Sequence, residues 1–170
     1  GSTSSNQDVL TKVLDKGEIK IGYVINPPSL IKNPNTGQLS GIYYDAVEQL
    51  GKNLGLKINW AEETGWGTMV EGLGVGRYDM VVGGIWPSAT RARRANFSVP
   101  LYFSTVGVYT KPGDNRFSDL NRINNKNIII AVVDGEMSSI IASTSFPNAK
   151  LLSLPQDTQL SQLLLSIKTG

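Results

Sequence analysis

An alternation of strand-like and helix-like segments is the feature that most limits what this chain can fold into. Residues Glu18 to Val24 alternate as a strand does, and Tyr44 to Leu54 carry apolar residues at helical spacing. The order continues with a strand pattern at Leu56 to Trp60, a helix pattern at Thr68 to Val75 and an apolar run at Met80 to Gly84. Short joints between such elements favour parallel strands and right-handed crossovers, so the sequence predicts an α/β fold.

A second, smaller α/β pattern follows from residue 127 onward. We predict a strand at Ile128 to Val133, a helix at Ser138 to Ser145 and a strand at Lys150 to Leu154. A last helix is expected at Thr158 to Lys168, with Asp157 as its candidate N-cap. The chain therefore divides into two α/β parts.

The predicted domain limits follow from the segments between these patterns. Residues 1–7 are polar and are expected to be a disordered leader, and Gly1-Ser2 is typical of the remnant of a removed purification tag. Residues 8–107 form the predicted first lobe, which opens with a short helix up to Lys16, and 108–170 form part of a second. Val106 to Thr110 alternates around Gly107, which predicts a strand leading out of the first lobe.

Composition excludes several classes of function. The net charge of the 170 residues is +2, which indicates no nucleic-acid partner, and no apolar run approaches the roughly 20 residues of a membrane span. The chain has no cysteine, which fits an exported protein. It also has no histidine, the usual general base and the commonest metal ligand, so we predict no catalytic residue, metal or cofactor.

The segment from Gly83 to Arg91 is the candidate binding site. A strand that ends in Gly83-Gly84 and leads to Ser88, a good helix N-cap, places N–H groups and the Arg91 guanidinium toward negative charge. Ligands of parallel sheets bind beyond the carboxyl ends of the strands, which here also include Asn26 and the loop from Glu62 to Trp66. A solvated basic turn is the alternative interpretation.

Three motifs around this segment resemble a known family, the extracytoplasmic solute-binding proteins of polar amino-acid ABC transporters. The motifs are Gly41-Ile42-Tyr43-Tyr44-Asp45, then Trp66 with Leu73, Gly76, Arg77, Tyr78 and Asp79, then Phe97-Ser98-Val99-Pro100-Leu101-Tyr102. Their order and spacing match the family, known as family 3, over about residues 18–170. The resemblance implies a two-lobed type II periplasmic-binding-protein fold, with a nearly complete first lobe and the first part of a second.

The resemblance also implies a function and a location. Such a protein binds a small amino-acid-like or carboxylate ligand in the cleft between its lobes, closes by a hinge, here near Val106 to Tyr109, and delivers the ligand to a membrane permease. A periplasmic or extracellular location is expected, after removal of a signal peptide, with a lipid anchor on the precursor as one option. The family continues beyond Gly170, so we expect a second lobe that is exposed on one sheet edge. Such a lobe would either pack against another chain, by self-association, or be poorly ordered.

Site residues in the first lobe are carried over by position. Arg91 takes the place of the arginine that binds the ligand's α-carboxylate, with a surface arginine as the alternative. Trp66 would form a wall of the cleft or else lie in the core, and Ser88 would donate to the ligand while capping its helix. Gly83 and Gly84 would face the ligand with their backbone groups, or serve only the turn.

Three positions depart from the family pattern. Trp86 stands where the family has a small serine or threonine, and Asn26 lies where it often has an aromatic residue. In the second lobe, Glu136 replaces a hydroxyl residue at a helix start that includes Ser138, where it would repel a carboxylate or attract a cation. These departures argue against an ordinary amino-acid specificity.

Two other classes of protein share this fold. A cyclohexadienyl or arogenate dehydratase would need a general acid, and the nearby carboxyl groups belong to Glu62, Glu63 and Glu136. The same module also forms the extracellular sensor domain of receptors and histidine kinases. We favour a binding protein without enzymatic activity.

Overall fold

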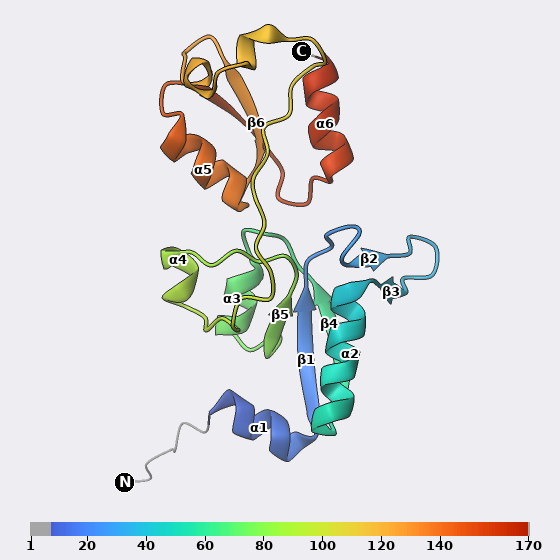
Figure 1. The fold of residues 1–170 in the computed structure, drawn as a ribbon. Coiled ribbons are helices and arrows are strands. Elements are labelled where there is room, and N and C mark those ends of the chain that lie inside the picture. Colours follow the sequence, from blue (N-terminus) through green and yellow to red (C-terminus); the bar gives the residue numbers. More distant parts are fainter. Residues whose placement is uncertain (1–7, 170) are drawn as a thin grey trace. The chain divides into compact units, whose positions relative to one another are not determined.

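The computed structural model describes residues 8–169; the predicted leader at 1–7 and Gly170 lie outside the described residues. The chain divides into two compact units. The first comprises residues 8–64 and 68–97, and the second comprises residues 65–67 and 98–169. In Figure 1 the first unit carries the elements from α1 to α4 and the second those from β6 to α6.

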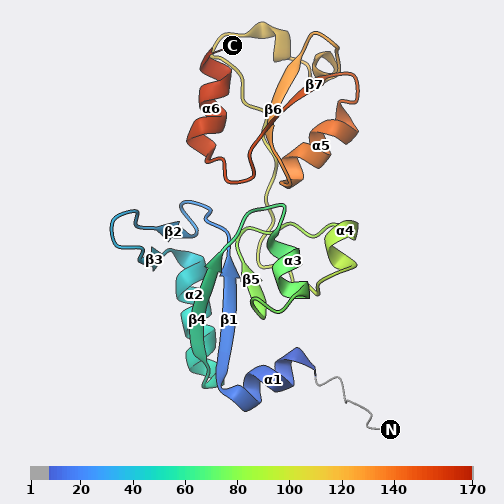
Figure 2. The ribbon, with the colours of Figure 1, turned by 180° about the vertical axis from the view of Figure 1, so that it is seen from behind.

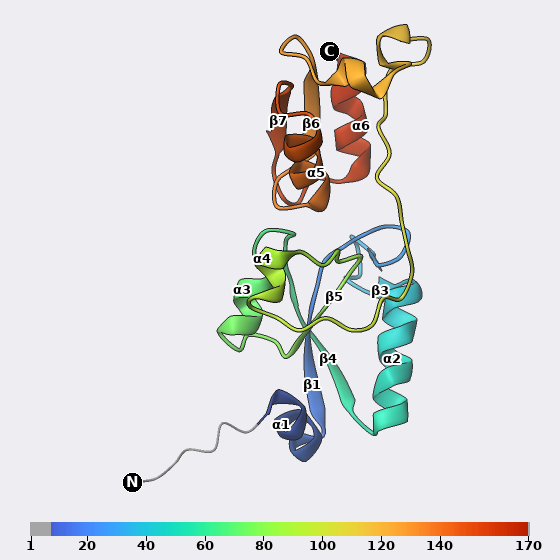
Figure 3. The same ribbon diagram turned by 60° about the vertical axis from the view of Figure 1, so that its left-hand side comes forward.

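The first unit is built on a parallel sheet of strands β1 (Glu18–Tyr23), β4 (Lys57–Glu63) and β5 (Met80–Val82), in the order β4-β1-β5. Helices α2 (Ile42–Leu54) and α3 (Met69–Gly74) make the crossovers and lie on opposite sides of the sheet (Figure 3). This arrangement confirms the predicted alternation. The crossover through α2 runs from β1 to β4, and the crossover through α3 runs back from β4 past β1 to β5. Two right-handed crossovers that run in opposite directions along a sheet place their helices on opposite faces.

Close packing around Tyr78 holds this unit together. Tyr78, Ile21 and Met69 are almost fully buried, and the Tyr78 hydroxyl donates a hydrogen bond to the Met69 carbonyl oxygen at 2.6 Å. A Cβ atom on Gly22 would lie only 2.7 Å from the Tyr78 ring. The ring therefore fits because β1 carries a glycine at this point.

Smaller elements complete the first unit. Helix α1 (Val9–Lys16) ends at Gly17, whose φ of 70° is the left-handed conformation of a C-cap glycine. Strands β2 (Ile31–Lys32) and β3 (Leu39–Ser40) form an antiparallel pair around the predicted turn (Figure 2). Lys32 of this pair makes an ion pair with Glu63 at 2.8 Å, which ties the pair to the end of β4.

The second unit contains a parallel pair of strands, β6 (Ile129–Val133) and β7 (Lys150–Leu154), with helices α5 (Met137–Ser145) and α6 (Leu160–Thr169). Two short 3-10 helices, Asn115–Phe117 and Leu120–Ile123, precede them. The buried side chains that form its core are Ile123, Val132, Val133 and Ala142. The predicted strand–helix–strand–helix order is confirmed.

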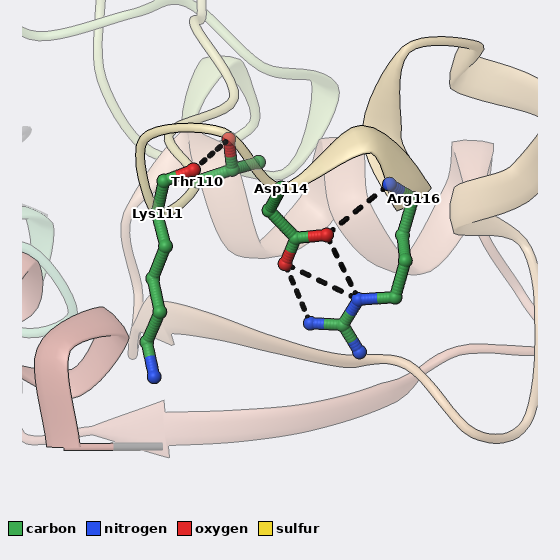
Figure 4. A network of polar contacts seen from close by, with 4 residues as sticks. All are labelled: Thr110, Lys111, Asp114 and Arg116. Carbon is green, nitrogen blue, oxygen red and sulfur yellow. Dashed lines mark hydrogen bonds and ion pairs between the residues drawn. The ribbon is translucent and has the colours of Figure 1, made fainter.

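An ion pair between Asp114 and Arg116 stabilises the turn before the first 3-10 helix of the second unit (Figure 4). The Asp114 carboxylate accepts hydrogen bonds from Arg116 Nε at 2.9 Å and Nη2 at 2.7 Å, and also from the Arg116 backbone N–H at 3.1 Å. This pairing lowers the pKa of Asp114, chiefly through the hydrogen bond from the Arg116 side chain. The Lys111 side chain points away from the pair in Figure 4.

Three sequence predictions need correction. Val106–Thr110 forms no strand, because a strand needs a partner and no described residue pairs with it. Strand β4 continues to Glu63 rather than ending at Trp60, since its ladder with β1 extends to the pair Tyr23 and Glu63. Helix α6 begins at Leu160 rather than at Thr158, so Asp157 is not at its N-cap position. The backbone N–H of Gln159, the residue before the helix, donates to the Gln162 side chain at 2.8 Å.

Candidate binding site

The parallel register brings the carboxyl ends of three strands to one edge of the sheet. Tyr23 pairs with Glu63 on one side and with Val82 on the other, so β1, β4 and β5 end side by side. The residues that follow them, Asn26 after β1 and Gly83 after β5, leave from this edge. Parallel α/β sheets bind their ligands at this edge, through groups on the loops that follow the strands.

Gly83 lets the β5 loop run close beside β1. The Val24 N–H donates to the Val82 carbonyl at 3.0 Å, and the Ile85 N–H donates to the Gly83 carbonyl at 2.8 Å, which turns the chain sharply. A Cβ atom on Gly83 would lie 3.3 Å from Val24 Cβ, closer than most side-chain contacts allow. Gly83 and Gly84 are half-buried, and their predicted contact with a ligand stays a prediction.

Ser88 caps the short helix α4 (Ala89–Ala92) that carries Arg91. Its backbone is extended, with φ −142° and ψ 158°, and its hydroxyl oxygen accepts a hydrogen bond from the Arg91 N–H at 3.3 Å. The capping role expected from the sequence is therefore confirmed. The serine places Arg91 in the first turn after the glycine loop.

The guanidinium of Arg91 is held by the loop itself. Its Nη1 donates a hydrogen bond to the Trp86 carbonyl oxygen at 2.9 Å. Arg91 is half-buried, whereas the neighbouring Arg93 and Arg94 are exposed. This hydrogen bond limits the orientation of the guanidinium plane. Two parallel hydrogen bonds to a carboxylate require such a defined orientation.

Asn26 lies in the first unit, whereas Trp66 lies in a segment that groups with the second. The backbone of Asn26 closes a small loop, since its N–H donates to the Leu30 carbonyl at 3.0 Å and its carbonyl accepts from the Ser29 N–H at 2.8 Å. Trp66 is half-buried in the short segment Gly65–Gly67, which groups with the second unit. Trp86 is half-buried in the first unit.

In the second unit, Glu136 occupies the N-cap position of α5. Its carboxylate accepts a hydrogen bond from the Ser138 N–H at 2.8 Å, and its carbonyl oxygen accepts one from the Ser139 hydroxyl at 2.7 Å. Free N–H groups at a helix N-terminus attract anions, and one of these N–H groups in α5 is thus already paired with a carboxylate of the chain. The negative charge of Glu136 is also favourable at a helix N-terminus.

Within each unit, the structure brings several predicted site residues onto one loop or helix start. The β5 loop unites Gly83, Gly84, Trp86, Ser88 and Arg91, and α5 unites Glu136 with Ser138. Sequence reasoning missed two contacts, the Trp86 carbonyl that holds Arg91 and the Ser139 hydroxyl at α5. A backbone acceptor leaves no signal in a sequence. Ser139 does carry one, because a hydroxyl residue next to Ser138 at a predicted helix start is a candidate for a capping contact.

Residues 8–169 present neither a metal-binding cluster nor a membrane-spanning helix. No group of three or more acidic, histidine or cysteine side chains there is arranged to hold a metal ion. No helix in that range combines the length and apolar character needed to cross a membrane.

Comparison with known proteins assigns the chain to a family. The model of the bacterial extracellular solute-binding proteins, family 3, matches residues 19–163. The chain therefore belongs to this family, as the motifs around Arg91 predicted.

Two curated relatives show how much of such proteins the chain represents. The L-cystine-binding protein TcyJ of Escherichia coli K12 is 26% identical over 110 residues, which are 65% of this chain and 41% of that protein. The membrane-bound lytic murein transglycosylase F of Aeromonas hydrophila is 23% identical over 168 residues, 99% of this chain and 33% of that protein. The chain thus spans less than half of either relative.

Solved structures confirm the fold class. The ancestral amino acid-binding protein described as a precursor of cyclohexadienyl dehydratase matches with a TM-score of 0.79 at 23% identity, covering 96% of this chain and 70% of that one. A Streptococcus pneumoniae amino acid ABC transporter substrate-binding protein matches with a TM-score of 0.78 at 20% identity, covering 96% and 68%. At such identities the likeness establishes the α/β fold of the family and nothing about the ligand.

Proposed function

We propose that the complete protein is the binding component of an amino-acid ABC transporter and that Arg91 holds the carboxylate of its ligand. Membership of the family supports this, and two similar proteins are described as binding L-cystine and L-arginine. Delivery of the ligand to a membrane permease, in the periplasm or outside the cell, completes the proposal. The boundary between lobes at 107/108 and the hinge near it belong to the same proposal.

The orientation of Arg91 is the observation that carries it. Ser88 fixes the backbone of Arg91, and the Trp86 carbonyl fixes its guanidinium at the edge where the sheet ends. A surface arginine would be as exposed as Arg93 and Arg94, but Arg91 is half-buried. The Ser88 hydroxyl, Gly83 and Gly84 are proposed to add hydrogen bonds, and Asn26, Trp66 and Trp86 to border the ligand.

Glu136 narrows the proposed ligand class. Because its carboxylate already accepts the Ser138 N–H, a second ligand carboxylate near this helix start would meet a negative charge. We therefore expect a ligand with one carboxylate and a neutral or cationic remainder rather than a dicarboxylate.

A ligand screen tests the proposal. The complete protein is screened by thermal shift against amino acids, polyamines, opines and small carboxylates, since a ligand that binds the folded state raises the melting temperature. Arg91→Ala should remove charged hydrogen bonds of about 3 kcal/mol, a roughly 100-fold rise in Kd. Arg93→Ala is the matched control and should leave Kd unchanged; equal losses in both variants would reject Arg91 as the binding residue.

We also propose that the chain binds without chemistry. The carboxylates considered as general acids take part in structural contacts: Glu62 pairs with Arg77 at 3.0 Å, Glu63 with Lys32 at 2.8 Å, and Glu136 caps α5. Incubation of the complete protein with a cyclic diene carboxylic acid should leave that compound intact. Its Arg91-dependent conversion, followed by absorbance, would establish a dehydratase instead.

A further inference from the structure

Gly135 and Gln156 leave the sheet of the second unit at the same edge. Val133, the last residue of β6, pairs with Leu154, the last residue of β7, and the Asp134 N–H donates to the Leu154 carbonyl at 2.9 Å. Gly135 and Gln156 therefore both lie just beyond the carboxyl ends of these parallel strands. Parallel α/β sheets bind ligands at such an edge.

The segment Gly65–Gly67, which groups with this unit, packs on the Gln156 side chain. The Gly67 N–H donates a hydrogen bond to Gln156 Oε1 at 3.0 Å. A Cβ atom on Gly65 would lie only 2.9 Å from Cδ of the same side chain. The carboxamide of Gln156 therefore lies against the glycines on both sides of Trp66.

The turn before α5 packs on the same segment. Gly135 has a φ of 75°, and a Cβ atom on it would lie 2.6 Å from Gly67 Cα and 2.7 Å from Gly67 N. Two backbones can approach this closely only where no side chain separates them, so glycine is required at position 135. The next residue, Glu136, is the N-cap of α5. The segment that carries Trp66 thus lies at the start of α5.

We propose that Gln156 is a positioning residue of the binding site. Its carboxamide oxygen holds the backbone of Gly65–Gly67 on the turn at Gly135 and thereby fixes Trp66, a residue proposed to border the ligand. The inference rests on the proposed function, because it names the residue that places one wall of that site. Gln156 acts through Trp66 rather than by contact with the ligand.

A glutamine suits this role chemically. Its carboxamide oxygen accepts a hydrogen bond without adding a charge to an edge where the carboxylate of Glu136 already caps α5. Gln156 is also half-buried, whereas the neighbouring Gln159 and Gln162 are exposed. The Gln156 side chain therefore belongs to a packed contact, unlike the other glutamines that follow β7.

The first test needs no ligand and follows the Gly67 amide of the complete protein by NMR. Gln156→Met keeps the length of the side chain but removes the acceptor, so the Gly67 amide proton should move upfield and exchange faster with solvent. Gln156→Glu keeps an acceptor and should preserve the hydrogen bond. Gln159→Met, at an exposed position, is the control and should leave the Gly67 signal unchanged.

Two glycines of the second unit provide a matched comparison. Gly135 and Gly113 both have positive φ, 75° and 78°, so alanine strains the backbone at each. No atom of the described chain lies within 4 Å of the Cβ position of Gly113, whereas that of Gly135 meets Gly67. Gly135→Ala should therefore shift the Gly67 amide signal, and Gly113→Ala should not. Circular dichroism checks that both variants remain folded.

The second test measures the Kd of a ligand found by the thermal-shift screen. Gln156→Met should raise Kd about 5-fold, the size of one neutral hydrogen bond. In a Trp66→Ala background the same substitution should add nothing, because the wall that Gln156 positions is already gone. A general structural effect would instead give the same loss in both backgrounds.

Several results would overturn the proposal. A Gly67 amide that ignores Gln156→Met would rule out the hydrogen bond, and equal shifts in Gly135→Ala and Gly113→Ala would rule out the packing. Additive losses from Gln156→Met and Trp66→Ala would show that Gln156 does not act through Trp66.

Failure of the proposed function has a different signature. Arg91→Ala would then leave Kd unchanged, or no ligand would bind, while the Gly67 amide still responds to Gln156→Met. Gln156 would in that case hold the Trp66 segment without serving a ligand site, which would also overturn its positioning role in binding.

Discussion

The Nη1 atom of Arg91 lies 2.9 Å from the carbonyl oxygen of Trp86, so the side chain proposed to hold the ligand is positioned by the backbone of its own loop. A guanidinium can keep this bond while other N–H groups of the same plane point to a carboxylate. An ammonium group has no such fork. Arg91→Lys should therefore raise the Kd of a carboxylate ligand about 10-fold although the charge is retained, as measured by calorimetry. Arg94→Lys, at an exposed position, is the control, and equal affinity of Arg91→Lys and wild type would contradict the positioning role.

Ser88 is expected to stabilise the loop through its cap. Ser88→Ala removes the acceptor of the Arg91 N–H and should cost about 1 kcal/mol of unfolding free energy in urea denaturation. Ser88→Asp keeps a cap acceptor and should restore that stability, but its charge should repel a carboxylate ligand. A Ser88→Asp variant that binds the ligand as well as wild type would show that this side chain does not face it.

Two glycines of α3 should respond in opposite ways to alanine. A Cβ atom on Gly72 would overlap the phenol ring and hydroxyl of Tyr78, so Gly72→Ala should destabilise the protein by about 3 kcal/mol through overpacking. Gly74, in the same helix, has nothing within 4 Å of its Cβ position. Gly74→Ala should be neutral or stabilising by up to about 1 kcal/mol because alanine favours helix. Urea denaturation of both variants measures the contrast, and similar effects would disprove the packing argument.

The Asp114–Arg116 pair predicts a local dependence on pH. The pKa of Asp114 is lowered, chiefly by the side-chain hydrogen bond from Arg116, so it is lower in the folded than in the unfolded chain. The pair therefore stabilises the turn above the unfolded-state pKa, and that contribution is lost as the pH falls through the folded-state pKa. In an NMR titration of the Asp114 carboxyl carbon, Arg116→Gln should raise the midpoint toward the usual aspartate value. Arg122→Gln should leave it unchanged, and a midpoint insensitive to Arg116→Gln would rule out the pairing in solution.

Local patterns in the sequence were enough for much of the fold and for the local setting of Arg91, the arginine proposed to bind the ligand. The apolar spacings of 3.6 and two residues located the helices α2 and α5 and the strands β6 and β7 to within about two residues. Such spacings are informative because one side of a helix or strand faces the core and the other faces solvent. The cap at Ser88 and the position of Arg91 after it were equally local. The family motifs surround the same segment, and the match over residues 19–163 confirms the family.

Other features of the fold and of the candidate site depend on contacts between residues far apart in the sequence or on contacts of backbone atoms. Strand β4 reaches Glu63 because β1 offers it a ladder, while Val106–Thr110 has the composition of a strand but no described partner. The bond from Arg91 to the Trp86 carbonyl uses a backbone oxygen that every residue type possesses, so no residue pattern announces it. The sequence alone determined which segments favour helix or strand and where the arginine stands. Only the tertiary structure decided which strands are paired and how that arginine is held, because hydrogen-bond partners are set by proximity in space rather than along the chain.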